Sequence, residues 1–115
     1  MLTLFGIKNC DTVKKARKWL EQNDIAYQFH DFRSDGLQRT QVKAWIDALG
    51  GEAILNRRSS TWRQLGNKPT EPLDESVVLE LLVRNPALIK RPVISHNGQV
   101  HVGFSERDFR NWFAT

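Results

Sequence analysis

The stretch that decides the fold is residues 1–29, MLTLFGIKNCDTVKKARKWLEQNDIAYQF. It opens with a short apolar run that ends before Gly6, and this pattern predicts a buried strand. Apolar residues then recur at helical spacing over about 11–23, and apolar residues alternate with polar ones over 25–29. The order is therefore strand, helix, strand, a crossover that normally places the two strands parallel and right-handed.

The middle of the chain, about residues 37–91, is expected to form a helical insertion. Its first helix should begin near Thr40 as the N-cap and close at Gly50, because apolar residues repeat there at helical spacing. Two further helices are expected, over about 61–65 and 74–84, on either side of a proline-containing loop at 68–72.

The end of the chain returns to strands. Segments 93–95 and 99–102 are predicted to form an antiparallel hairpin, because Asn-Gly lies between them at 97–98. A final helix is expected after Ser105, with Phe104 packed back onto it. The full order predicts an α/β protein in which a four-stranded mixed sheet, βαβ followed by ββα, carries the helical insertion.

Length and composition limit the class of protein. The 115 residues leave room for one domain, residues 1–115, and a composition that is 40% hydrophobic excludes a disordered chain. No apolar run is long enough for a spanning helix or a signal peptide, so we expect a cytoplasmic protein with no membrane partner. Cys10 is the only cysteine, which excludes an internal disulfide and any CxxC zinc or redox motif.

Positive charge is concentrated in three segments. Residues 8–18, 56–68 and 84–91 hold 12 of the 17 basic residues and a single acid, Asp11. If these segments converge in space, they form an anion-binding site. If they do not, they are three unrelated solvated faces, and charge alone leaves both interpretations open.

Cys10 lies between the first strand and the next helix, with Asn9 or Asp11 expected as the helix cap. At that position backbone N–H groups and the helix dipole stabilise a thiolate, and Lys8 could add a positive charge. The strand-to-helix elbow, where α/β sheets place ligand sites, favours a functional thiol. The alternative is a buried structural cysteine.

Other kinds of site have weaker signals. The histidines, at 30, 96 and 101, lack the spacing of a helical zinc site, so no bound metal is expected. The four tryptophans could stack on bases, but three of them lie on apolar helix faces. We therefore expect no direct nucleic-acid partner.

Four motifs occur in order along the chain: GIKNCDT at 6–12, LNRRSSTWR at 55–63, KRPVI at 90–94 and VGFSE at 102–106. Together they resemble the glutaredoxin-coupled arsenate reductase (ArsC) family and its Spx-like relatives, and within that family the YffB branch. The resemblance covers essentially the whole chain. It implies a thioredoxin-like fold with a helical insertion, and a cis peptide bond before Pro92 that faces the thiol.

The resemblance also implies roles for individual residues. Cys10 matches the nucleophile, and Arg91 matches the arginine that contacts an oxyanion and the thiolate. The central arginine of the family maps onto Arg57 or Arg58. Phe104 stands where genuine arsenate reductases carry a third arginine, which argues against arsenate as the substrate. The expected anion-binding residues are therefore Arg91, Arg57, Arg58, Lys8 and Asn9.

Two functions are compatible with these observations. The first is a monomeric thiol reductase without a bound cofactor, which acts on a small oxyanion or thiol substrate and is regenerated by glutathione or glutaredoxin. The second is an Spx-like regulatory protein that binds RNA polymerase through the basic insertion, with Cys10 as a vestige or a sensor. Spx itself uses a CxxC switch whose second position here is Val13, which argues against a disulfide-switched regulator.

Overall fold

The computed structural model describes residues 2–65 and 73–113. The chain divides into two compact units: unit 1 is Met1–Asp35 with Arg91–Thr115, and unit 2 is Gly36–Lys90. The loop predicted at 68–72 lies outside the described residues. Among the helices that are described, none is long and apolar enough to cross a membrane.

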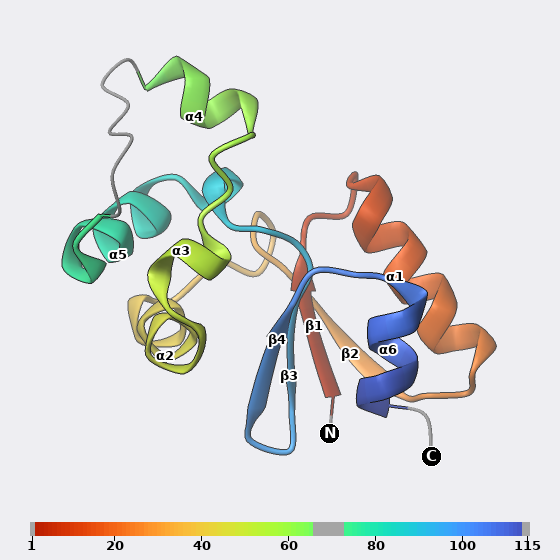
Figure 1. Ribbon diagram of the computed structural model, residues 1–115. Coiled ribbons are helices and arrows are strands. Elements are labelled where there is room, and N and C mark those ends of the chain that lie inside the picture. Colours follow the sequence, from red (N-terminus) through yellow and green to blue (C-terminus); the bar gives the residue numbers. More distant parts are fainter. Residues whose placement is uncertain (1, 66–72, 114–115) are drawn as a thin grey trace. The chain divides into compact units, whose positions relative to one another are not determined.

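Unit 1 is built on a four-stranded mixed sheet, as the sequence predicts (Figure 1). Its strands are β1 (Leu2–Gly6), β2 (Tyr27–Asp31), β3 (Val93–His96) and β4 (Gln99–Val102), in the order β2-β1-β3-β4. The β1 and β2 strands are parallel, whereas β1 with β3 and β3 with β4 are antiparallel. The predicted crossover and the predicted hairpin are both confirmed, and Asn97 (φ 51°) and Gly98 (φ 78°) form the turn.

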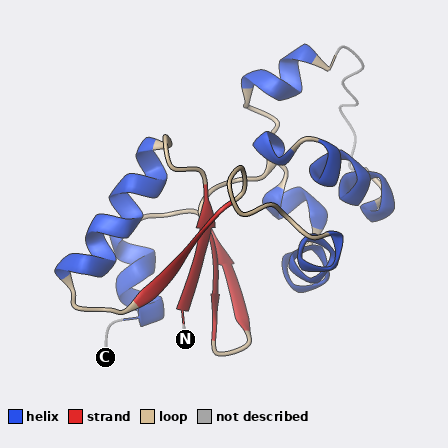
Figure 2. Ribbon diagram, turned by 180° about the vertical axis from the view of Figure 1, so that it is seen from behind, coloured by secondary structure: helices blue, strands red, loops and turns tan. Residues whose placement is uncertain are grey.

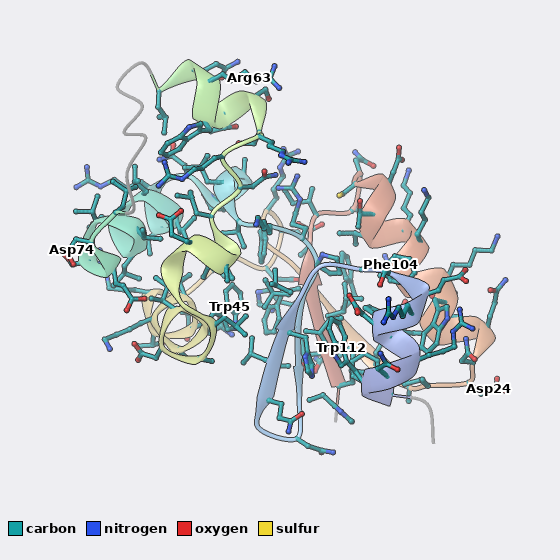
Figure 3. The ribbon with its side chains drawn as sticks, viewed as in Figure 1. Asp24, Trp45, Arg63, Asp74, Phe104 and Trp112 are labelled. Carbon is teal, nitrogen blue, oxygen red and sulfur yellow. The ribbon has the colours of Figure 1, made fainter. Side chains whose placement is uncertain are left out.

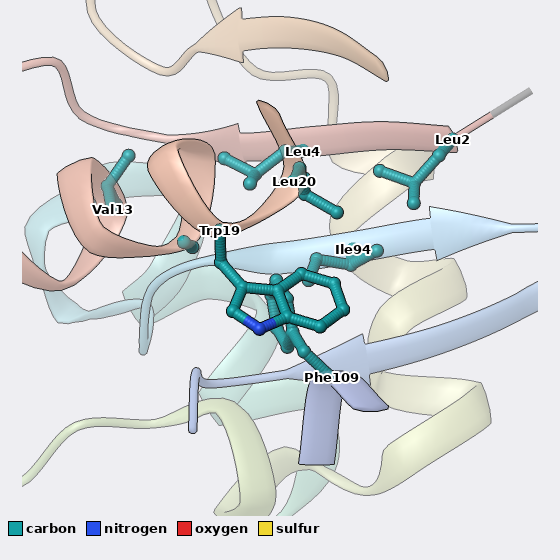
Figure 4. Close-up of a cluster of buried hydrophobic side chains, with 8 residues drawn as sticks. Leu2, Leu4, Val13, Trp19, Leu20, Ile94 and Phe109 are labelled. Atoms are coloured by element: carbon teal, nitrogen blue, oxygen red, sulfur yellow. The ribbon is translucent and has the colours of Figure 1, made fainter. Parts of the chain in front are cut away.

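Two helices cover one face of this sheet, α1 (Asp11–Gln22) and α6 (Glu106–Phe113) (Figure 2). Phe109 is fully buried between them and the sheet, with its ring 5.4 Å from that of Trp19 (Figure 4). Ser105 caps α6 by accepting the amide of Asp108 at 3.1 Å, and Phe104 packs edge-on against Phe109 at 4.6 Å, as predicted. The buried cluster consists of Leu2, Leu4, Val13, Ala16, Trp19, Leu20, Ile94 and Phe109.

Unit 2 is helical throughout its described residues. It contains α2 (Arg39–Leu49), α3 (Gly51–Ile54), α4 (Ser60–Gln64), α5 (Glu75–Arg84) and the 3-10 helix η1 (Pro86–Leu88). The α2 helix begins after a capping box between Gln38 and Gln41, so the prediction of Thr40 as its N-cap is wrong. The sequence also missed α3, because Gly50 adopts a left-handed φ of 88° that ends α2 and lets a second helix start at once.

Candidate functional site

Cys10 lies directly after the loop that leaves β1, and it is the N-cap residue of α1. Its backbone is extended, with φ −114° and ψ 124°, and its carbonyl accepts the amide of Lys14 at 2.9 Å. The prediction of Asn9 or Asp11 as the cap is therefore wrong: Asp11 is already helical and Asn9 lies one residue too early. The thiol itself is at the helix N-terminus, where the backbone amides favour negative charge.

Gly6 sets how closely α1 approaches the strand before it. A Cβ atom at this position would lie 2.7 Å from Cγ2 of Val13, which is fully buried in the core. A larger residue would push the first turn of α1, and Cys10 with it, away from the sheet.

Asp31, the last residue of β2, holds the loop that leads to Cys10. Its Oδ2 atom accepts the amide of Lys8 at 3.2 Å, and its Oδ1 atom accepts the amides of Arg33 at 2.7 Å and Ser34 at 3.3 Å. Burial raises the pKa of Asp31, but these amides and the charge of Arg33 outweigh it, so the pKa lies below its ordinary value. This role of Asp31 is not predicted above from the sequence, although an acid at the carboxyl end of a parallel strand is a usable signal.

The electrostatics at Cys10 favour a thiolate. Partial burial raises the pKa of the thiol, but the amide of Val13, the guanidinium of Arg91 and the amide of Thr12 all lower it. The net result is a pKa below the ordinary value of a cysteine. Cys10 is half-buried.

Arg91 reaches this thiol from the segment that leads into β3. The Arg91–Pro92 peptide bond is cis, as the family resemblance implied, and Pro92 is buried. The Pro92 carbonyl accepts the amide of Gly103 at 2.8 Å, which ties this segment to the end of β4. The Nε atom of Arg91 is buried, and the guanidinium acts on the Cys10 thiol both by a hydrogen bond and by its charge.

The remaining anion-binding candidates have different surroundings. Lys8 and Asn9 are both exposed, and Lys8 is fixed through its backbone amide to Asp31. Arg57 belongs to unit 2, where its Nε and Nη2 atoms donate to the two carboxylate oxygens of Glu52 at 3.0 Å and 2.8 Å. Its guanidinium also lies 5.1 Å from the ring centre of Trp62.

Arg58, the other residue of the tandem pair, is exposed and also belongs to unit 2. Its amide donates to Oδ1 of Asn56 at 3.0 Å, which shapes the turn before α4. A role for Arg57 or Arg58 toward Cys10 stays a prediction.

The comparison with known families agrees with this geometry. The sequence model of the ArsC family matches residues 5–112. The chain belongs to the ArsC family. An uncharacterized protein of Haemophilus influenzae is 43% identical over 99% of this chain and 100% of its own length. The global transcriptional regulator Spx of Streptococcus mutans is 31% identical over 96% of this chain and 81% of its own length.

Solved structures of ArsC-family relatives show the same fold. The YffB protein has a TM-score of 0.90 at 39% identity and covers 96% of this chain and 97% of its own. An arsenate reductase (ArsC) related protein from Brucella melitensis has a TM-score of 0.78 at 37% identity, with 99% and 95% covered. The predicted family and the thioredoxin-like fold are therefore confirmed.

One position of this ArsC-family chain changes the charge expected near the site. Phe104 packs on Phe109 with ring planes at 85°, so an apolar ring stands where the resemblance implies an arginine (Figure 3). Within residues 2–65 and 73–113, no group of three or more His, Cys, Asp or Glu side chains is placed to hold a metal ion. The chemistry available in unit 1 is that of a stabilised thiolate with an adjacent guanidinium.

Proposed function

We propose that this protein is a glutathione-coupled thiol oxidoreductase in which Cys10 is the nucleophile. The observation that carries the proposal is the place of Cys10: it caps α1 while Arg91, which precedes a cis proline, stabilises its thiolate. A thiol with a lowered pKa is ionised to a greater extent near neutral pH, and the thiolate is the form that attacks disulfides.

The reaction runs in two exchanges. The Cys10 thiolate attacks the glutathione sulfur of a mixed disulfide RS–SG, forms a Cys10–glutathione disulfide and releases the thiolate RS⁻. A second glutathione thiolate then attacks the glutathione sulfur on Cys10, which yields oxidised glutathione and restores the Cys10 thiolate. The external thiol is needed because the sequence holds one cysteine, and the low pKa makes Cys10 a good leaving group in the second exchange.

Arg91 would serve both exchanges. Its charge stabilises the thiolate before attack and after release, and a guanidinium can also hold a carboxylate of glutathione. A small oxyanion substrate remains part of the proposal, but arsenate is disfavoured because Phe104 supplies no charge there.

The test is reaction of the purified chain with oxidised glutathione, followed by intact-mass spectrometry. We expect one glutathione per chain, no adduct on Cys10→Ser, and removal of the adduct by reduced glutathione with glutaredoxin. A mixed disulfide substrate should then turn over when glutathione reductase and NADPH regenerate glutathione. An unmodified wild-type chain, or an adduct that glutathione cannot release, would reject the proposal.

A second candidate is a regulatory protein that binds RNA polymerase. It is supported by relatives described as the global transcriptional regulator Spx, such as that of Listeria innocua, which is 32% identical over 97% of this chain. A CxxC switch is unavailable, because the second position is Val13, which is fully buried in the core. Binding of purified RNA polymerase by Cys10→Ser as tightly as by the wild type, with no glutathione turnover, would favour this candidate.

A further inference from the structure

The exposed side of α1 carries a row of lysines that begins one turn from the nucleophile. Lys14 and Lys18 follow Cys10 at four and eight residues, so they share its face of the helix, and Lys15 lies beside them. All three lysines are exposed. At a rise of about 1.5 Å per residue, this lysine row extends about 12 Å from the thiol along the helix.

The acids beside the lysine row, Asp11 and Glu21 on α1 and Glu106 on α6, reduce its positive charge but form no ion pair with it. Across residues 2–65 and 73–113, no carboxylate forms an ion pair with Lys14, Lys15 or Lys18. The nearby acid Glu21 accepts the hydroxyl of Tyr27 at 2.6 Å, and that hydroxyl in turn accepts Nε of Arg17 at 3.0 Å. The field of the lysine row is therefore open to a ligand from solvent.

A small hollow of mixed polar and apolar lining adjoins the lysine row, between α1 and the start of α6, and Trp19 and Phe104 supply its apolar part. It encloses about 220 Å³, less than the roughly 300 Å³ at which pockets for small-molecule ligands begin. This volume suits one apolar side chain of a larger partner better than a separate small molecule. Its lining residues are Lys15, Lys18, Trp19, Gln22, Phe104 and Glu106.

We propose that the lysine row and this hollow form a docking surface for an acidic segment of a partner protein, which delivers its glutathionylated cysteine to Cys10. Acidic side chains of the partner would lie along the row, and one apolar side chain would enter the hollow over Trp19 and Phe104. Trp19 and Phe104 in the hollow suit an apolar side chain, which a phosphate backbone lacks, so a protein segment fits this surface better than a nucleic acid. This inference rests on the proposed function, because the docked cysteine reacts by the first exchange described above.

The docking surface can be tested with two synthetic peptides of equal length, each carrying one glutathionylated cysteine and one leucine. In the first peptide the leucine is flanked by glutamates, and in the second by glutamines. We expect glutathione transfer to Cys10 to be about tenfold faster or more from the acidic peptide at low salt. The advantage should disappear at about 1 M salt, where the screening length falls to about 3 Å.

Charge-reversal variants show where the preference arises. The double variant Lys15→Glu with Lys18→Glu should lose the rate preference for the acidic peptide. The control, Lys43→Glu with Arg63→Glu, changes the net charge equally at exposed positions of unit 2 and should keep at least half of that preference. The neutral reagent dithiodipyridine should react at the same rate with all these proteins. If the α1 reversal fails to fold, Lys15→Gln with Lys18→Gln is used and should reduce the preference at least threefold.

A second measurement does not depend on thiol chemistry. The indole resonance of Trp19 in Cys10→Ser should shift on titration with the acidic peptide and stay unchanged with the glutamine peptide. A shift without any transfer in the wild type would keep the docking surface and reject the proposed function. Equal transfer rates with an unmoved Trp19, or a stronger shift with a single-stranded oligonucleotide, would overturn the docking surface.

Discussion

The two units differ in how their basic side chains are paired. In unit 2, Arg39 and Arg84 pair with Glu80, Lys43 with Asp47, and Arg57 with Glu52, whereas Arg58 and Arg63 are exposed and form no ion pair with a described acid. In unit 1, Arg91 instead stabilises a thiolate, and the lysine row of α1 has no paired acid among the described residues.

A count of basic residues therefore overstates the charge available to a ligand. The sequence shows three basic segments of similar density, yet Arg57 and Arg84, in two of them, are paired with Glu52 and Glu80. Paired surface charges largely cancel each other's fields, whereas unpaired ones raise the local concentration of anions. Functional charge is therefore expected mainly in unit 1, and substitutions at four positions, each with its control, test this expectation.

The largest effect is expected from Arg91→Ala, which should raise the pKa of Cys10. Arg91 stabilises the thiolate both by a hydrogen bond and by its charge, and an adjacent opposite charge typically moves a pKa by about one to three units. The thiolate fraction near neutral pH should fall by about tenfold or more. The pH dependence of iodoacetamide alkylation measures this shift.

Arg84→Ala is the matched control for Arg91. It also removes one arginine, but this side chain is 77% exposed in unit 2 and lies 3.8 Å from Glu80. We expect its alkylation profile to match the wild type, and Arg91→Lys to fall between the wild type and Arg91→Ala. Equal shifts in Arg91→Ala and Arg84→Ala would mean that the helix N-terminus alone tunes the thiol and would break the comparison.

A smaller effect is expected from Asp31→Asn, which weakens the anchor of the loop before Cys10. Hydrogen bonds to a charged group contribute about 1.5–3 kcal/mol, so we expect a loss of about 2 kcal/mol in unfolding free energy at pH 7. The folded pKa of Asp31 is lowered, so its contribution is present above the unfolded pKa of about 3.9 and is lost as the pH falls through the folded value.

Urea denaturation at several pH values checks both parts of this prediction. The difference between the wild type and Asp31→Asn should shrink below about pH 4, where the unfolded carboxyl is protonated. Asp24→Asn, at an exposed position with φ 55° that Asn tolerates, should leave stability unchanged at every pH. A difference for Asp31→Asn that stays constant down to pH 2 would show that its charge does not matter.

The sequence predicts those features that depend on neighbours close along the chain. Helical and alternating periodicity located β1, α1 and β2, and the Asn-Gly pair located the hairpin between β3 and β4. The cis bond before Pro92 was predicted from the family resemblance and not from the local sequence, because only about one X–Pro bond in twenty is cis in folded proteins. The role of Asp31 was missed because its carboxylate meets an amide 23 residues away.

The same limit explains why the sequence could not choose between Arg57 and Arg58. The two residues are adjacent and identical, and only the fold shows that Glu52 engages Arg57 through both carboxylate oxygens. Two adjacent arginines are distinguished by the side chains that each contacts in the fold, and not by their positions in the sequence.

The smallest effects are expected from this pair. Arg57→Ala loses a partly screened ion pair and the contact with Trp62, so it should lower the unfolding free energy by about 1 kcal/mol and leave the rate of glutathione adduct formation unchanged. Arg58→Ala should leave stability within about 0.5 kcal/mol, because its side chain is exposed, and should slow adduct formation about threefold at low salt if the family's central arginine is Arg58. Urea denaturation measures the stability of both variants, and stopped-flow kinetics measures their rates of adduct formation.

A slower reaction in Arg57→Ala alone would show that the ion pair between Arg57 and Glu52 opens when glutathione binds. In that case Glu52→Gln should accelerate the reaction, because it releases Arg57. That result would assign the central arginine to Arg57 instead of Arg58, and a slower reaction in either variant would place functional charge in unit 2 as well.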